Sequence, residues 1–109
     1  RADQIINSGG IKLNPFTLEA TMEETIKKTG ITEYFVSGLA HDTLGQMLVL
    51  FILSENADTP SIQEELKKVI SSPYLLPKKI IVLDKFIYNA SGKTDRLKIV
   101  QQYQQQDHA

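Results

Sequence analysis

The segment "MLVLFIL", residues 47–53, is the longest apolar run in the chain, and the rest of the predicted fold is arranged around it. Its length of seven residues is far too short for a membrane-spanning helix, which needs about 20 apolar residues. A strand that is apolar at nearly every position is typical of the centre of a sheet covered on both faces. We therefore predict a central strand over residues 44–54 with a packing layer on each side.

Two more strands of the same sheet are predicted from the segments that flank this run. Residues 33–39 precede it and are joined to it by a short turn at 41–43, and residues 79–84 (KIIVLD) follow it. Each of these runs is rich in β-branched, aliphatic or aromatic residues, as strands usually are.

Three segments have the apolar period of amphipathic helices, and each begins at a polar cap or at a proline in its first turn. The predicted starts are Asn14-Pro15, Thr59-Pro60, and Thr94 or Asp95, and Gly30 ends the first helix. The residues predicted to face the core are Leu18, Met22 and Ile26 in the first helix, Ile62, Leu66, Val69 and Ile70 in the second, and Leu97, Val100 and Tyr103 in the third.

A small glycine hairpin completes the predicted fold. Ser8-Gly9-Gly10 separates two short strand-like runs, 5–7 and 11–13, and glycine readily adopts the positive φ that a tight hairpin requires. The elements together predict an α+β fold: this hairpin plus a mainly antiparallel three-stranded sheet packed with about three helices. A chain of 109 residues is expected to form one domain with a modest core of its own.

Composition excludes several classes of site. The chain has no cysteine, so disulfides and thiolate metal sites are excluded, and a reducing cytoplasm is compatible with this composition. The two histidines, His41 and His108, lack the spacing of a metal site, so no metal ligand is predicted. There is no signal peptide pattern, and we predict a cytoplasmic location.

Net charge argues against a nucleic-acid partner. Twelve basic residues balance thirteen acidic ones, which provides no long-range field for a polyanion. A small nucleic-acid binder was considered, but the chain also lacks an aromatic stacking signature. The residues that it would use are Lys78, Lys79, Lys93, Arg96 and Lys98.

The loop "YNASGKTDR", residues 88–96, contains the end of a nucleotide-binding P-loop, Gly92-Lys93-Thr94. A P-loop needs a second glycine five positions before Gly92, and that position is Ile87. The P-loop interpretation is therefore excluded. Asn89 can make local turn bonds in this loop, and an isolated lysine such as Lys93 is most often a solvated surface residue.

Two motifs near the ends of the chain change that interpretation. The opening "RADQIINSGGIKLNP", residues 1–15, and the loop with "SGK" together resemble the C-terminal domain of the adenylate-forming enzymes: acyl-CoA synthetases, nonribosomal peptide synthetase adenylation domains and luciferases. The resemblance covers essentially the whole chain. It departs from the family pattern at 87–90, where "IYNA" replaces the usual proline and threonine, and at Thr17, which replaces a glutamate. The residues that match are Arg1, Asp3, Ser8, Gly9, Gly10, Lys12, Pro15, Glu19, Ser91, Gly92, Lys93, Asp95 and Arg96.

The resemblance implies that Lys93 is the catalytic residue of the first half-reaction. In this reaction a carboxylate attacks the α-phosphate of ATP, and an ammonium group between the two anions stabilises the charge that develops. Ser91 and Gly92 would support the loop and leave room for the substrates to enter.

The same resemblance assigns the opening segment to the second half-reaction, in which CoA forms a thioester. Gly9 and Gly10 would let the backbone approach the pantetheine arm, with Gly10 lining the channel, and Lys12 would face the active site. Asp3, in a hinge region at residues 1–4, would change its backbone torsions between the two poses, and Arg1 would lie near the nucleotide. A plain hairpin turn and an exposed strand lysine are the alternatives that remain open for these residues.

The chain starts at Arg1 without an initiator methionine, and we therefore expect a fragment: residues 1–109 as the mobile C-terminal lid of a ligase whose large N-terminal domain is absent. The expected substrates of the full-length enzyme are ATP, CoA and a small-molecule carboxylic acid, and Mg²⁺ is expected to accompany ATP. The fragment alone is predicted to bind none of these stably and to have no ligase activity. The sequence looks most like bacterial o-succinylbenzoate-CoA ligases of menaquinone synthesis. The alternatives are a medium- or long-chain fatty acyl-CoA synthetase, or a non-catalytic α+β interaction module.

Overall fold

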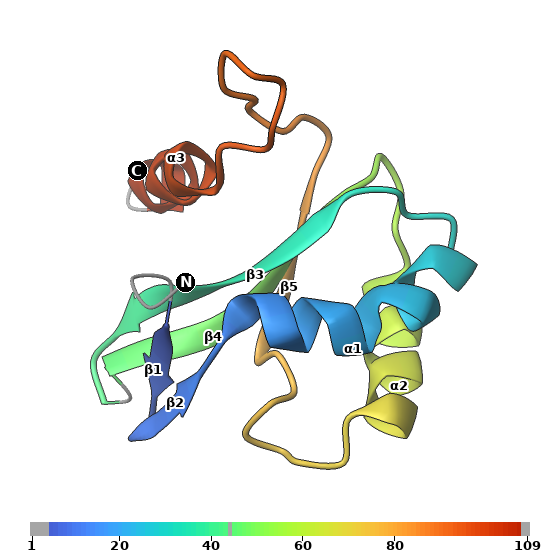
Figure 1. Cartoon of the computed structure of the whole chain (residues 1–109), viewed down its shortest axis with the longest axis vertical. Helices are drawn as coiled ribbons and strands as arrows, with labels where there is room; N and C mark the ends of the chain where they lie inside the picture. The colour runs from blue at the N-terminus through green and yellow to red at the C-terminus, as the bar shows by residue number, and fades with distance from the viewer. Residues whose placement is uncertain (1–4, 44, 108–109) are drawn as a thin grey trace.

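The computed structural model describes residues 5–43 and 45–107, in which one β-sheet lies between two layers of helices (Figure 1). Helices α1 and α2 cover one face of the sheet and α3 covers the other. This arrangement, with three helices and a sheet, confirms the α+β fold class. The elements are β1 (Ile6–Ser8), β2 (Ile11–Leu13), α1 (Pro15–Lys28), β3 (Tyr34–His41), β4 (Gly45–Leu53), α2 (Thr59–Val69), β5 (Lys79–Leu83) and α3 (Arg96–Asp107).

The sheet differs from the prediction in its strand count and in the direction of β5. Strand β4 pairs with β3 in antiparallel register from Tyr34↔Ile52 to His41↔Gly45, but it pairs with β5 in parallel. The reason is that the chain crosses over through α2 between β4 and β5, which returns it in the same direction. The β1–β2 hairpin is also joined to β4, through Ser8↔Gly45, so the sheet has five strands.

Strand β4 is the centre of the protein, as its apolar sequence predicts. The side chains from Leu48 to Ile52 have no exposed surface. They alternate between two separate cores, because successive side chains of a strand point to opposite faces.

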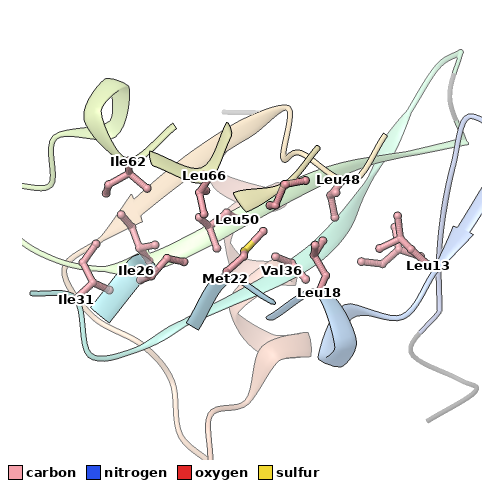
Figure 2. Close-up of a cluster of buried hydrophobic side chains, with 13 residues drawn as sticks. Leu13, Leu18, Met22, Ile26, Ile31, Val36, Leu48, Leu50, Ile62 and Leu66 are labelled. Carbon is pink, nitrogen blue, oxygen red and sulfur yellow. The ribbon is translucent and has the colours of Figure 1, made fainter. Parts of the chain in front are cut away.

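The first core lies between the sheet and the α1–α2 layer (Figure 2). Met22 and Ile26 of α1 and Leu66 of α2 meet Leu48 and Leu50 of β4 there, and all five are fully buried. The second core lies under α3 and is partly aromatic. In it, Phe35 stacks on Phe51 with ring centroids 4.9 Å apart, and Phe86 and Tyr103 meet these rings edge-on.

Two residues that were predicted to face the core are exposed instead. Leu97 is 68% exposed and Val69 is 46% exposed. On α3 the inward face is set by Ile99 and Val100, and Leu97 is two residues from Ile99, about 200° around the helix. On α2 the buried stripe runs through Ile62, Leu66 and Ile70, which leaves Val69 at its edge.

The predicted helix starts are confirmed at the level of individual caps. The Asn14 side-chain oxygen accepts from the amides of Phe16 and Thr17 at 2.8 and 3.4 Å. Asp95, one of the two candidates for α3, accepts from the Lys98 amide at 3.1 Å. Helix α2 begins at Thr59 as predicted, with Asp58 as its cap. None of the helices in the part of the chain described here is long and apolar enough to cross a membrane.

Candidate functional site

The loop that carries Lys93 is held in one shape by Asn89. The Asn89 Oδ1 atom accepts three hydrogen bonds, from the Ser91 amide at 3.0 Å, the Ser91 hydroxyl at 2.7 Å and the Lys93 amide at 3.1 Å. Backbone bonds close the turn, since the Asn89 amide donates to the Lys93 carbonyl at 2.8 Å and the Gly92 amide donates to the Asn89 carbonyl at 2.9 Å. Gly92 adopts a φ of 85°, which favours glycine. The expected turn bonds of Asn89 are therefore present.

The base of this loop is fastened to the sheet. Tyr88 forms an isolated β-bridge with Thr94, and the Asp95 amide donates to the Ile87 carbonyl at 2.8 Å. The Tyr88 hydroxyl lies 2.7 and 2.9 Å from the two carboxylate oxygens of Glu33, just before β3. This hydrogen bond raises the pKa of Tyr88. The loop is thus connected to the sheet although its residues are exposed.

A second connection joins the first residue of α3 to α1. The Arg96 guanidinium donates two hydrogen bonds to the Glu19 carboxylate, at 2.6 and 2.7 Å. The Phe16 ring lies 4.6 Å and the Phe35 ring 5.5 Å from the guanidinium carbon. Glu19 also accepts from the Val36 amide at 2.9 Å, so this one carboxylate joins α1, β3 and α3.

Lys93 is exposed and lies at the rim of an open hollow of about 720 Å³. The hollow lies beside β1, β3 and β4 and is closed on one side by the start of α3. Among residues 5–43 and 45–107, the Lys93 ammonium has no hydrogen-bond or ion-pair partner, whereas the guanidinium of Arg96 in the same hollow is paired with Glu19. The side chain of Lys93 can therefore give all three of its donors to an anion.

The glycine hairpin lies away from this loop. Gly9 and Gly10 form the turn between β1 and β2 with φ of 59° and 83°, and the turn and the Lys93 loop lie toward opposite ends of the molecule (Figure 1). A Cβ atom added at Gly10 would meet nothing within 4 Å, so only its φ requires a glycine within this chain. Lys12 is exposed on β2. The structure therefore does not bring the two groups of predicted site residues together.

Gln46 of β4 is a neighbour of the site that no sequence motif points to. Its Oε1 atom accepts from the Asn7 amide at 2.8 Å and so fastens the hairpin to the sheet, and the residue also lines the hollow beside Lys93. The ion pair of Glu19 and Arg96 was missed as well, although both residues belong to the matched motifs. Arg1 and Asp3, for which a nucleotide contact region and a hinge are predicted, lie outside the described residues.

No metal-binding cluster of at least three His, Cys, Asp or Glu side chains exists in the described part of the chain. The Lys93 ammonium, which no other described residue pairs, fits an anionic substrate such as a phosphate or a carboxylate.

The comparisons with known proteins agree with one another. The chain is 31% identical over 104 residues to the 2-succinylbenzoate–CoA ligase of Listeria monocytogenes, which covers 94% of this chain and 21% of that enzyme. It is 30% identical over 98 residues to a probable non-canonical nonribosomal peptide synthetase, CymA, of Salinispora arenicola, covering 88% of this chain and 1% of that protein. No family model matches the chain.

Among solved structures, the acyl-CoA synthetase (AMP-forming)/AMP-acid ligase II-like protein from Dyadobacter fermentans has the same fold, with a TM-score of 0.84 and 28% identity. This match covers 94% of the present chain and 30% of the other one. The chain is therefore similar to a segment of AMP-forming acid–CoA ligases and spans about a fifth of the length of the CoA ligase relatives that it matches.

Proposed function

We propose that residues 1–109 are the mobile C-terminal lid of a longer acid–CoA ligase, and that Lys93 is its catalytic cation. The observation that carries this proposal is the Lys93 ammonium, which no other described residue pairs, on a loop that Asn89 holds in shape. The similarity to CoA ligases along nearly the whole chain supports it.

Lys93 acts in the first half-reaction. A carboxylate oxygen of the acid attacks the α-phosphorus of ATP, the bond from that phosphorus to the bridging oxygen breaks, and pyrophosphate leaves. Two anions must approach each other in this step, and negative charge builds on the phosphoryl oxygens. An ammonium group with three free donors lowers the energy of that arrangement. Mg²⁺ would accompany ATP, held by the nucleotide and the other domain, and would offset part of the phosphate charge.

The glycine hairpin acts in the second half-reaction. The thiol sulfur of CoA attacks the acyl carbonyl carbon, the bond to the AMP oxygen breaks, and the thiol proton passes to solvent. Gly9 and Gly10 bring the backbone against the pantetheine arm, and Lys12 faces the active site. Because the hairpin and Lys93 lie apart (Figure 1), the lid must rotate between the steps. Asp3 in residues 1–4 is the proposed hinge, and Arg1 contacts the nucleotide.

For the acid we propose o-succinylbenzoate, a precursor in menaquinone synthesis, in a cytoplasmic enzyme. The similarity to the Listeria 2-succinylbenzoate–CoA ligase supports this choice. The intact enzyme, given ATP and CoA, should form the thioester of o-succinylbenzoate faster than that of a medium-chain fatty acid. A strong preference for the fatty acid would establish the alternative, a fatty acyl-CoA synthetase.

The central test measures the two half-reactions of the full-length enzyme separately. Lys93→Ala should slow acyl-adenylate formation about 10²- to 10³-fold, while thioester formation from supplied acyl-adenylate stays close to that of the unmodified enzyme. Lys98→Ala, which removes an exposed lysine of α3, is the matched control and should change neither rate. An equal loss in both half-reactions would refute the proposed division of labour. Unchanged rates in Lys93→Ala would favour the non-catalytic interaction module.

A further inference from the structure

We infer that Glu19 and Arg96 form a positioning pair that sets where Lys93 stands during acyl-adenylate formation. The inference rests on the proposed function and adds a role that Lys93 alone does not explain. Neither residue needs to touch the substrate, because both act through the loop.

The first step of the argument is the geometry of the pair. Arg96 presents a planar fork that matches the two Glu19 oxygens at 2.6 and 2.7 Å, an arrangement that fixes direction as well as distance. The Glu19 side chain is only 12% exposed and that of Arg96 29%. Exposed ion pairs contribute little, since water and salt screen them. This pair is largely covered, with Phe16 and Phe35 beside the guanidinium.

The second step is that only two side chains of the first turn of α3 are fastened to the body of the protein, Arg96 at its first position and Ile99 at its fourth. Leu97 is 68% exposed and Lys98 is exposed too, and the first buried apolar side chain of the helix is Ile99. Arg96 is therefore the anchor at the end of α3 that adjoins the Lys93 loop, three residues before the buried Ile99.

The third step connects Arg96 to Lys93. Only Thr94 and Asp95 lie between them, and both are fixed by the bridge to Tyr88 and the hydrogen bond to Ile87. These bonds make the base of the loop one unit that adjoins Arg96, and we infer that a displacement of Arg96 shifts this unit and Lys93 with it. Misplacing a catalytic group by about 1 Å can cost about 10²-fold in rate.

The last step explains why Glu19 suits this task. Its carboxylate also accepts from the amide of Val36, and its main-chain carbonyl accepts from the Tyr34 hydroxyl at 2.8 Å. Val36 lies on β3, at the edge of the sheet, where this amide has no strand partner. Glu19 is thus held by two hydrogen bonds from β3 and offers Arg96 a rigid acceptor.

The test uses the full-length enzyme with Arg96→Lys, which keeps the positive charge but loses the fork. We expect acyl-adenylate formation to slow about 10-fold through kcat, with the KM for ATP and the thioester half-reaction close to those of the unmodified enzyme. Glu19→Gln keeps the size and one acceptor oxygen and should act in the same direction, and it carries the test if Arg96→Lys fails to fold. Glu64→Gln breaks the exposed Lys67–Glu64 pair and is the control, with no expected effect.

A double variant separates positioning from a merely structural role. If the pair acts through Lys93, then adding Arg96→Lys to Lys93→Ala should slow acyl-adenylate formation no further, since the two changes act on one group. Full additivity, or a parallel loss of both half-reactions with a fall in Tm, would overturn the inference. A different result would overturn the proposed function itself: Lys93→Ala with an unchanged rate of acyl-adenylate formation.

Discussion

Asn89→Ala should loosen the Lys93 loop without unfolding the protein. The substitution removes the acceptor of three hydrogen bonds, from the Ser91 amide, the Ser91 hydroxyl and the Lys93 amide. A net hydrogen bond contributes about 0.5–1.5 kcal/mol, and these groups are exposed, so water replaces part of each bond. We expect the free energy of local opening to fall by about 1–2 kcal/mol.

The assay is amide hydrogen exchange of the chain, read at single residues by NMR. An opening free energy lower by about 1–2 kcal/mol corresponds to a roughly 5- to 30-fold faster exchange at Ser91 and Lys93. Asn89→Asp keeps the acceptor and should retain most of the protection, while Asn56→Ala, at an exposed loop asparagine, is the control. Unchanged exchange at both amides in Asn89→Ala would refute the claim that Asn89 holds the loop. Faster exchange throughout β4 would show a global effect instead.

Three further predictions concern the rest of the chain. Met22→Ala, at a fully buried residue of the first core, should lower the free energy of unfolding by about 2–5 kcal/mol in urea titration. Met47→Ala, at a half-buried residue, is the control. An equal or larger effect of Met47→Ala would contradict the assignment of the core. Gly10→Ala should lower the free energy of unfolding by about 1 kcal/mol, because alanine is strained at the positive φ of this position and not because its Cβ atom clashes. Gly10→Asn should lower it less, since asparagine tolerates a positive φ better. Equal losses in the two variants would argue against backbone strain. Burial, and then the charges of Glu23 and Glu19, raise the pKa of Tyr34 to about 12. The contribution of protonated Tyr34 to the free energy of unfolding is therefore fully present below pH 10. It is lost as the pH rises through about 12. Because the pKa of Tyr88 is raised as well, the ultraviolet titration uses Tyr88→Phe, in which one phenol should ionise near pH 12. Persistence of that phenol when Tyr34→Phe is added would exclude the assignment.

The parts of the fold that depend on local signals could be predicted from the sequence. The uninterrupted apolar run of β4 predicts a strand that is covered on both faces, and the structure confirms this prediction. Caps are equally local, since Asn14 and Asp95 bond to amides two or three residues away. These features need no knowledge of the rest of the chain.

Features that depend on the path of the chain could not be predicted in the same way. The parallel direction of β5 follows from the crossover through α2, and a strand sequence carries no mark of the direction in which its neighbour runs. Leu97 looks like a core residue by composition, yet the phase of α3 is set by contacts of Ile99 and Val100 with the second core.

The candidate site shows the same division. The Lys93 loop was selected from its residues and from the resemblance to a family, and its Asn89 turn is local. Glu19 and Arg96 are 77 residues apart, and Glu33 and Tyr88 are 55 apart, so no periodic pattern connects either pair. Only the fold brings each pair together.

The sharing of β4 by both cores has a consequence for timing. Every layer of the protein is packed on the same strand, so we expect the hairpin and the lysine loop to travel together as parts of one stiff body. Under the proposed function, a rotation of that body that carries the Lys93 ammonium to the nucleotide would withdraw Gly9 and Gly10 from the active site, and the reverse rotation would withdraw the ammonium. Consumption of ATP and capture of the thiol would then exclude each other in time without a separate gate.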